Sequence, residues 1–167
     1  MDKPFESARF WRIGVDPTKS RPAAEALIRR ILRGGSLPTI NTLVDSYNLA
    51  SIETEIALAA FDARKVKGEL LMHSSQIGEK FQGIGLDQPM TFQGGEIVVS
   101  DNEKMIAVYP HRDAEETKVI EATEDVLLMV CGVPGIPKQT LLKAGTIALK
   151  YITRFGNGAA EIEPYPL

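Results

Sequence analysis

The pattern of apolar and polar positions divides the chain into helices near its two ends and short strands between them. Apolar residues at helical spacing predict a helix between Ser20 and Gly34, a second from the Leu37-Pro38 turn to residue 50, and a third over residues 138–155. Short apolar or alternating runs predict strands at residues 8–15, 66–72, 96–100, 105–109, 118–122 and 126–131. Residues 51–58 and the glycine-rich stretch 74–89 are predicted to be loops.

The connections between the strands are short, which favours antiparallel pairing. Asp101 to Lys104 is a typical hairpin turn between the strands at 96–100 and 105–109. The run 126–131 is apolar throughout, which indicates a central strand, and we expect its Cys131 to be a small core residue. The sequence therefore predicts an α+β class with two short-stranded, mostly antiparallel sheets and helices packed over them. We expect one domain over residues 1–167, with a core at about 8–155 and a tail at 156–167.

The second predicted helix carries a polar row beside its apolar stripe. The stripe that we expect to be buried consists of Ile40, Leu43, Val44 and Tyr47. The polar row at i, i+4 and i+7 consists of Asn41, Asp45 and Asn48. Residues of these types often satisfy backbone groups inside small folds, and they also shape polar binding pockets. The sequence leaves both interpretations open, and we treat the three residues as candidates for substrate binding.

Three arginines gather in the last turns of the first predicted helix. Its inward face is expected to hold Leu27, Ile28, Ile31 and Leu32. Arg29, Arg30 and Arg33 would suit the negative end of the helix dipole, although three cations exceed what the dipole requires. They are therefore also candidates for contacts with phosphate groups.

Composition changes this picture in only a few respects. The formal net charge of −3 gives no overall basic field of the kind that advertises a nucleic-acid binder, although a local basic patch remains compatible with it. No apolar run approaches the roughly 18 residues of a membrane span, and the N-terminus shows no secretory signal, so we expect a cytoplasmic protein. His73 and His111 are the only histidines and one cysteine is present, so we expect neither a metal site nor a cofactor.

The richest candidate for chemistry is the segment His111 to Thr117, which follows a predicted strand. It combines an imidazole, a guanidinium, three carboxylates and a hydroxyl within seven residues. Arg112 could hold a phosphate or carboxylate through two parallel hydrogen bonds, and Asp113 could orient it. A solvated charged loop is the alternative interpretation of the same residues.

Motifs along most of the chain resemble those of one family. Asn41, Leu43-Val44-Asp45, Asn48 and Ala60-Phe61-Asp62 resemble the run N-N-x-V-D-x-x-N-Y … H-A-F-D. Downstream matches, at similar spacing, are Gly68 with His73 to Gly78-Glu79 (G-x-x-x-R-x-A-x-x-G-E), Ile97 to Asp101 (L-V-I-x-D) and Thr123 to Leu128 (T-x-x-V-L-L). These runs belong to the tRNA-editing module, the B3/B4 domain, of the phenylalanyl-tRNA synthetase beta subunit. The resemblance covers about residues 21–135, and no motif of a synthetase catalytic core accompanies it.

The resemblance implies roles for particular residues. Glu115 falls where the module carries its editing-site glutamate, which makes Glu115 the candidate catalytic residue. Ala59 stands where the family has a histidine of the hydrolytic pocket, and alanine can neither donate a hydrogen bond nor move a proton. His73 aligns with a family arginine, and we interpret it as a surface histidine.

Two function hypotheses of different classes follow. The first is a free-standing editing-like deacylase that hydrolyses the ester of a mischarged tRNA in trans, with tRNA or aminoacyl-tRNA as its partner. The second is a non-catalytic tRNA- or aminoacyl-binding module, which Ala59 and the acidic charge favour. A small-molecule hydrolase that shares only the fold is a third, weaker interpretation. A protein partner or a homo-oligomer is compatible with each.

Overall fold

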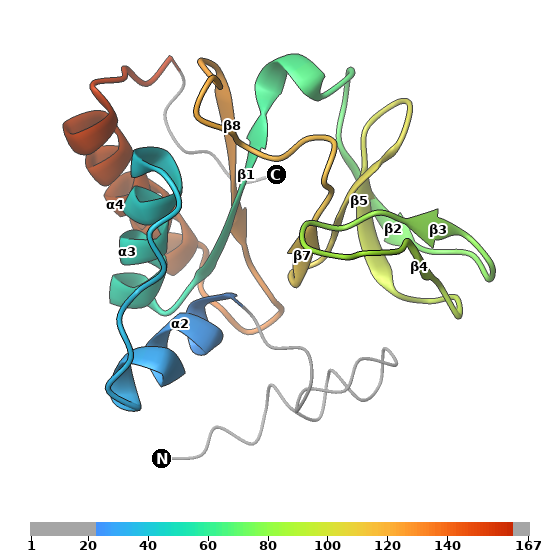
Figure 1. Cartoon of the computed structure of the whole chain (residues 1–167), viewed down its shortest axis with the longest axis horizontal. Coiled ribbons are helices and arrows are strands. Elements are labelled where there is room, and N and C mark those ends of the chain that lie inside the picture. Colours follow the sequence, from blue (N-terminus) through green and yellow to red (C-terminus); the bar gives the residue numbers. More distant parts are fainter. Residues whose placement is uncertain (1–22, 162–167) are drawn as a thin grey trace. The chain divides into compact units, whose positions relative to one another are not determined.

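The structure, a computed structural model, describes residues 23–161 (Figure 1). The strand predicted at 8–15 and the end of the predicted tail lie outside the described residues. The chain separates into two compact units. We call the part Phe61–Lys118 the sheet unit, and the parts Pro22–Ala60 and Val119–Leu167 the helical unit.

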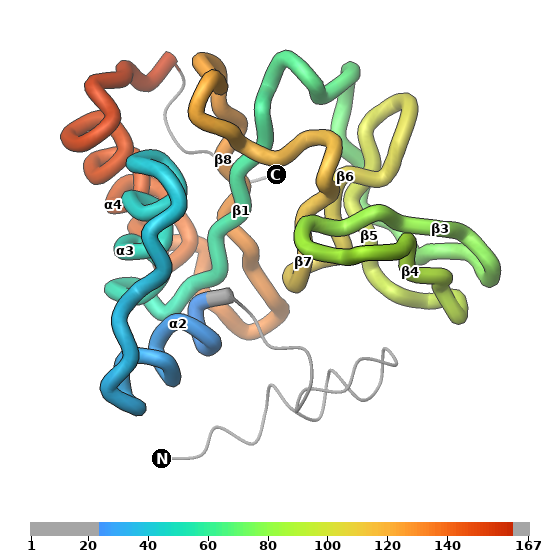
Figure 2. The backbone as a smooth tube through the Cα atoms, in the orientation of Figure 1, coloured from blue at the N-terminus to red at the C-terminus, as the bar shows by residue number. Residues whose placement is uncertain are grey.

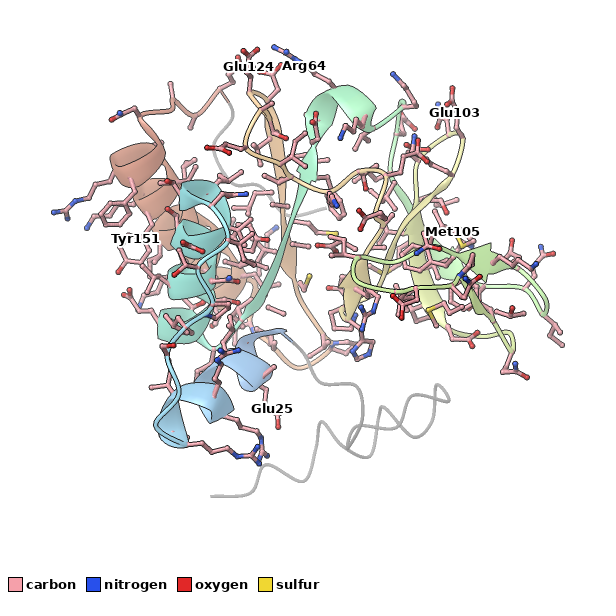
Figure 3. All side chains as sticks on the ribbon, viewed as in Figure 1. Glu25, Arg64, Glu103, Met105, Glu124 and Tyr151 are labelled. Atoms are coloured by element: carbon pink, nitrogen blue, oxygen red, sulfur yellow. The ribbon has the colours of Figure 1, made fainter. Side chains whose placement is uncertain are left out.

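Within residues 23–161, the helical unit contains three helices and most of a two-stranded sheet. The helices are α2 (Ala23–Leu32), α3 (Thr42–Thr54) and α4 (Lys138–Gly156), and strand β1 (Ala57–Asp62) pairs with β8 (Val126–Cys131). Helix α3 packs on α4 around Ala50, Leu58 and Ala148, three residues with 5% of their surface exposed or less. The Tyr151 hydroxyl of α4 (labelled in Figure 3) donates a hydrogen bond to the Glu53 carboxylate of α3, which joins the same two helices at the surface.

Helix α3 is longer than predicted, because hydroxyl side chains close its last turn. Ser51 to Thr54 are helical, and the strand β1 already begins at Ala57, so the loop predicted at 51–58 is wrong. The Ser51 hydroxyl donates to the carbonyl oxygen of Ile56 at 2.6 Å, and that of Thr54 donates to the carbonyl oxygen of Ala50 at 2.7 Å. Glu55 then takes a left-handed conformation (φ 57°) that ends the helix.

The apolar stripes predicted on α2 and α3 contain fewer buried residues than expected. Ile31 and Leu32 are 40% and 80% exposed, so the prediction that they face inward is wrong; they occupy the end of α2, whose buried contact is made by Ala24. Ile40 is 63% exposed, because α3 starts two residues after it. Val44 of the same stripe is buried, and Tyr47 packs against the core of the helical unit.

The sheet unit contains a four-stranded antiparallel sheet with the order β2-β5-β6-β7. Figure 2 follows the backbone of this unit and labels β5, β6 and β7. The strands of this sheet are β2 (Leu71–Ser74), β5 (Ile97–Ser100), β6 (Met105–Val108) and β7 (Arg112–Asp113). A second antiparallel pair, β3 (Lys80–Phe81) with β4 (Met90–Thr91), lies within the predicted loop 74–89 and just after it. The core of this unit is a buried cluster of Phe81, Phe92, Val98, Val108 and Ala114.

The strand predictions have mixed outcomes. Those at 96–100, 105–109 and 126–131 are confirmed to within one residue at an end, and so is the α+β class. The strand predicted at 66–72 forms later, at residues 71–74. The strand predicted at 118–122 is wrong, because Ile120 and Thr123 form a turn: the amide of each donates to an oxygen of the other. Cys131 is buried, as expected.

Candidate functional site

The segment His111 to Thr117 is held on both sides by backbone hydrogen bonds. Toward β6, the amide of Ala114 donates to the carbonyl oxygen of Ile106 at 2.8 Å. Toward the glycine turn (residues 82–86), the amide of Ile84 donates to the Asp113 carbonyl oxygen, and the amide of Glu115 donates to the Gln82 carbonyl oxygen, both at 2.9 Å. Part of the segment is the short strand β7, which the sequence pattern did not indicate. The backbone that carries these side chains is therefore held in place, as a binding or catalytic site requires.

The side chain of Arg112 packs against the glycine turn. A Cβ atom on Gly83 would come within 2.3 Å of Arg112 Cδ, so only glycine leaves room for the arginine stem. The guanidinium donates from Nη1 to the carbonyl oxygen of Ile84 and remains exposed. A guanidinium has five N–H donors, so this contact fixes its position and leaves other donors for an anion.

His111 and Asp113 flank Arg112 and have shifted pKa values. Burial lowers the pKa of His111 to about 4, with the neighbouring Arg112 cation as the smaller cause. Burial raises the pKa of the Asp113 carboxyl to about 7. At neutral pH the imidazole of His111 is therefore uncharged, and the Asp113 carboxyl is present in both its protonated and its ionised form. Strongly shifted pKa values concentrate at functional sites, although buried structural groups show them too.

Glu115 is paired with Lys118, the residue that directly follows the segment. Its carboxylate accepts a hydrogen bond from the Lys118 ammonium, and both side chains are more than a third exposed. The next residue, Glu116, lies 3.2 Å from Lys104 Nζ, an atom that also lies 3.6 Å from Asp101 and donates to the Lys65 carbonyl oxygen at 2.9 Å. Each glutamate is therefore paired with a cation: Lys118 is three residues from Glu115 in the sequence, whereas Lys104 reaches Glu116 only through the fold.

Thr117 closes the segment in the interior of the sheet unit. The residue is fully buried, and its hydroxyl has no hydrogen-bond partner among the described residues. Its carbonyl oxygen accepts from the amide of Asp62 at 2.9 Å. The sequence analysis counted this hydroxyl among the candidate groups of the segment but did not predict its burial, because burial of a threonine carries no local signal.

The polar row of α3 belongs to the helical unit and has structural contacts. Asn41 is the N-cap, and its side-chain oxygen accepts from the amide of Val44 at 2.9 Å. Asp45 Oδ1 accepts from the amide of Ile40 at 3.0 Å. Asn48 is half-buried. The contacts of Asn41 and Asp45 favour the structural interpretation of these two residues.

The three candidate arginines at the end of α2 are exposed, and local contacts hold two of them. Arg29 pairs with Glu25 one turn earlier on α2, with 2.6 Å between Arg29 Nε and Glu25 Oε1. Arg30 Nε donates to the carbonyl oxygen of Ser36 at 2.6 Å. Arg33 follows the end of the helix. These positions are compatible with phosphate contacts, which remain a prediction.

Ala59 lies in the middle of β1, whose six residues are all buried. Its own exposed fraction is 6%. A methyl group therefore fills the position that the family resemblance assigns to a histidine. Among residues 23–161, no group of histidine, cysteine and carboxylate side chains is arranged to hold a metal ion, and no helix is long and apolar enough to cross a membrane.

Comparisons with known proteins agree on one family. A family model described as the B3/4 domain matches residues 7–156. The phenylalanine–tRNA ligase beta subunit of Nocardia farcinica is 33% identical over 115 residues, which are 69% of this chain and 13% of that protein. The subunit of the same name from Ruegeria pomeroyi is 34% identical over 97 residues, 58% of this chain and 12% of that protein. The chain thus spans only a small part of the curated relatives that it matches.

A solved structure supports the same fold. It is an N-terminal fragment of the phenylalanyl-tRNA synthetase beta-subunit from Pyrococcus horikoshii, with a TM-score of 0.57 and 17% sequence identity. The similarity covers 68% of this chain and 40% of the fragment. At this identity the comparison concerns the fold alone.

Proposed function

Because the chain belongs to the B3/4 domain family, we propose that it acts in trans as a free-standing editing domain that hydrolyses the ester of a mischarged aminoacyl-tRNA. The observation that carries the proposal is the segment Arg112 to Glu115. It holds an oriented guanidinium, a carboxyl that titrates near neutrality and the glutamate that the family resemblance assigns to the editing site, all on one backbone segment fixed by hydrogen bonds. The curated relatives are named phenylalanine–tRNA ligase beta subunits, which supports tRNA as the partner. The cytoplasm, where tRNA is charged, is the compartment that fits this activity.

Three side chains would share the chemistry. The Arg112 guanidinium would bind the terminal phosphate or a carboxylate of the substrate. Glu115, steadied by Lys118, would orient either the attacking water or the amino group of the aminoacyl ester. Asp113 would receive a proton from that water, since a base with a pKa near the working pH transfers protons most efficiently. Attack of the water on the ester carbonyl releases the amino acid, and the ribose hydroxyl next to the ester would assist as a neighbouring group.

Ala59 favours a second candidate function, a non-catalytic module that binds tRNA or an aminoacyl group. The buried methyl group at this position cannot take part in hydrolysis, whereas the family histidine could. Such a module would use Arg112 and Glu115 for binding alone. A tRNA affinity that depends on salt, without loss of the ester, is the expected behaviour.

A deacylation panel separates the two functions. The purified protein is incubated with tRNAs that carry cognate or non-cognate amino acids, and loss of the ester is followed over time. We expect selective loss of one non-cognate aminoacyl group and no loss in a parallel preparation of Glu115→Ala. Uniform stability of all the esters, in the presence of protein shown to be folded, would contradict hydrolysis and favour the binding module.

A further inference from the structure

Away from the segment 111–118, the sheet unit holds a histidine and a serine in direct contact. His73 on β2 and Ser100 on β5 lie on paired strands, with 2.8 Å between His73 Nε2 and Ser100 Oγ. The other ring nitrogen, Nδ1, lies 3.1 Å from the carbonyl oxygen of Ser74. A carbonyl oxygen can only accept, so Nδ1 carries the proton of the neutral ring and Nε2 is the acceptor. The Ser100 hydroxyl therefore donates its hydrogen bond to His73.

The contacts of the Ser100 hydroxyl, the His73 ring and the Ser74 carbonyl oxygen are arranged as in a serine that is activated by a histidine. The hydroxyl is the nucleophile, the imidazole is the base within hydrogen-bond reach, and the backbone carbonyl fixes the tautomer that leaves Nε2 basic. Both residues are half-buried, so the pair has access to solvent. A cross-strand hydrogen bond that merely secures β2 is the alternative, and it would give Ser100 no special reactivity.

The register places the Ser100 hydroxyl between two apolar side chains. Ser100 pairs with Leu71 of β2 on one side and with Met105 of β6 on the other, and side chains of directly opposed residues lie on the same face. Leu71 is 64% exposed, and Met105 (labelled in Figure 3) packs against the core of the sheet unit. The pairing of β5 with β6 shifts at Ser100, a local irregularity of the kind that re-aims side chains next to active sites. An apolar acyl chain would find contacts on both sides of this hydroxyl.

We propose that Ser100 and His73 form an acyl-accepting dyad that reacts with esters of apolar acids and good leaving groups. Ser100 Oγ attacks the ester carbonyl as its proton passes to His73 Nε2. The imidazolium gives this proton to the leaving alcohol as the ester bond breaks, and an acyl-serine remains. Water then attacks the acyl-serine while His73 Nε2 takes its proton and passes it to Ser100 Oγ, which releases the acid and restores the serine. The dyad lies on β2 and β5, whereas β7 occupies the opposite edge of the sheet, so this inference does not rest on the proposed function.

Phosphorylation of the serine by an organophosphate is the sharpest test. The intact chain is treated with diisopropyl fluorophosphate, which transfers its phosphoryl group to an activated serine and loses fluoride, and the modified peptide is identified by mass spectrometry. We expect Ser100 to be labelled and the protein to release p-nitrophenolate from p-nitrophenyl butyrate. His73→Gln should slow the labelling by about 100-fold or more, since glutamine keeps a hydrogen-bonding partner for Ser100 but is no base.

Ser74→Ala is the matched control. Ser74 lies beside His73 on β2 and contacts the ring only through its backbone carbonyl, so this variant should be labelled at the wild-type rate. Absence of label on Ser100 in the folded wild-type protein would overturn the proposal. Equal labelling rates in wild type and a folded His73→Gln variant, checked by circular dichroism, would overturn it as well.

Discussion

Burial, rather than residue type, sets the charges of the candidate site. A histidine is often half-protonated near neutral pH and an aspartate is usually ionised, but His111 has a pKa of about 4 and Asp113 a pKa of about 7. The imidazole is therefore neutral, and the carboxyl becomes the group that titrates in the physiological range. Arg112, between them in the sequence, remains charged. The acid–base capacity of the segment thus resides in Asp113.

Asp113 should also reduce stability at neutral pH. Its pKa in the folded state lies above the ordinary 3.8, so the folded state holds the proton between about pH 4 and 7 while the unfolded chain loses it. Stability from this group is fully present below about pH 4 and lost as the pH rises through about 7. We expect the free energy of unfolding of Asp113→Asn, relative to wild type, to rise by up to about 4 kcal/mol between pH 4 and 8.

Urea denaturation of both proteins at a series of pH values measures this difference. His111 contributes to stability in the opposite direction, because its contribution is lost as the pH falls from 6.5 to about 4. This contribution is the same in both proteins if Asp113→Asn leaves the surroundings of His111 unchanged, and it then cancels in the difference. A difference between the two proteins that stays constant with pH would show that Asp113 ionises normally in the folded state.

Glu115→Ala should remove hydrolysis and leave the fold intact. Its ion pair with Lys118 is exposed, and such pairs contribute about 0–1 kcal/mol to stability. Loss of a group that positions the attacking water should slow ester hydrolysis by about 100-fold or more. Rates on the tRNA identified by the panel, with melting temperatures, test both statements. Glu121→Ala, at an exposed turn, is the control, and normal activity in Glu115→Ala would remove this residue from the mechanism.

Among the elements, β7 and α3 show opposite outcomes for polar residues that looked similar in the sequence. Backbone hydrogen bonds from neighbouring segments fix β7 and Glu115 just after it, so the side chains of Arg112 and Glu115 are not needed to hold the backbone. In α3, the polar groups serve the helix itself, since Asn41 and Asp45 accept from amides at its N-terminus. We therefore prefer Arg112, Asp113 and Glu115 as the candidate site, because the backbone around them is already hydrogen-bonded and does not need their side chains as partners.

Gly83→Ala tests whether the glycine turn positions Arg112. The added methyl group would overlap Arg112 Cδ and lie 3.0 Å from the Phe81 ring, so the arginine must leave its place. We expect tRNA affinity to fall as far as in Arg112→Ala, without further loss in the double variant. Filter binding at two salt concentrations measures the affinities. Gly156→Ala, where no atom lies within 4 Å of the added carbon, is the control. Unchanged affinity in Arg112→Ala at both salt concentrations would exclude its phosphate contact.

Considered as one chain, the protein is acidic, so the proposed tRNA binding would depend on local groups. The net charge of −3 repels a polyanion at long range. Cations that already neutralise a carboxylate, such as Lys104 and Lys118, contribute less to such binding than exposed arginines do. The end of α2 is the local concentration of arginine that the sequence pattern indicated.

Replacement of Arg29, Arg30 and Arg33 by alanine tests this surface. We expect weaker binding to all tRNAs alike and a shallower salt dependence, in which the slope of the binding constant falls by about one logarithmic unit for each phosphate that is no longer neutralised. Arg29 also pairs with Glu25, so its share should be the smallest. Replacement of exposed Lys143 and Lys150 on α4 is the control for a general change in charge. An unchanged salt dependence in the triple variant would assign the phosphate contacts to another surface.

The sequence alone determined the elements whose signals are local, and the family. Periodicity and turn residues were sufficient for α4, β5, β6 and β8, because each depends on neighbours in the chain. The motifs around Asn41 and Asp62 were sufficient for the B3/4 family. Tertiary structure alone decided the fit of Arg112 on Gly83, the shifted pKa values of His111 and Asp113, and the contact of His73 with Ser100. The physical reason is that desolvation and contact between side chains depend on groups tens of residues apart, which only the folded chain brings together.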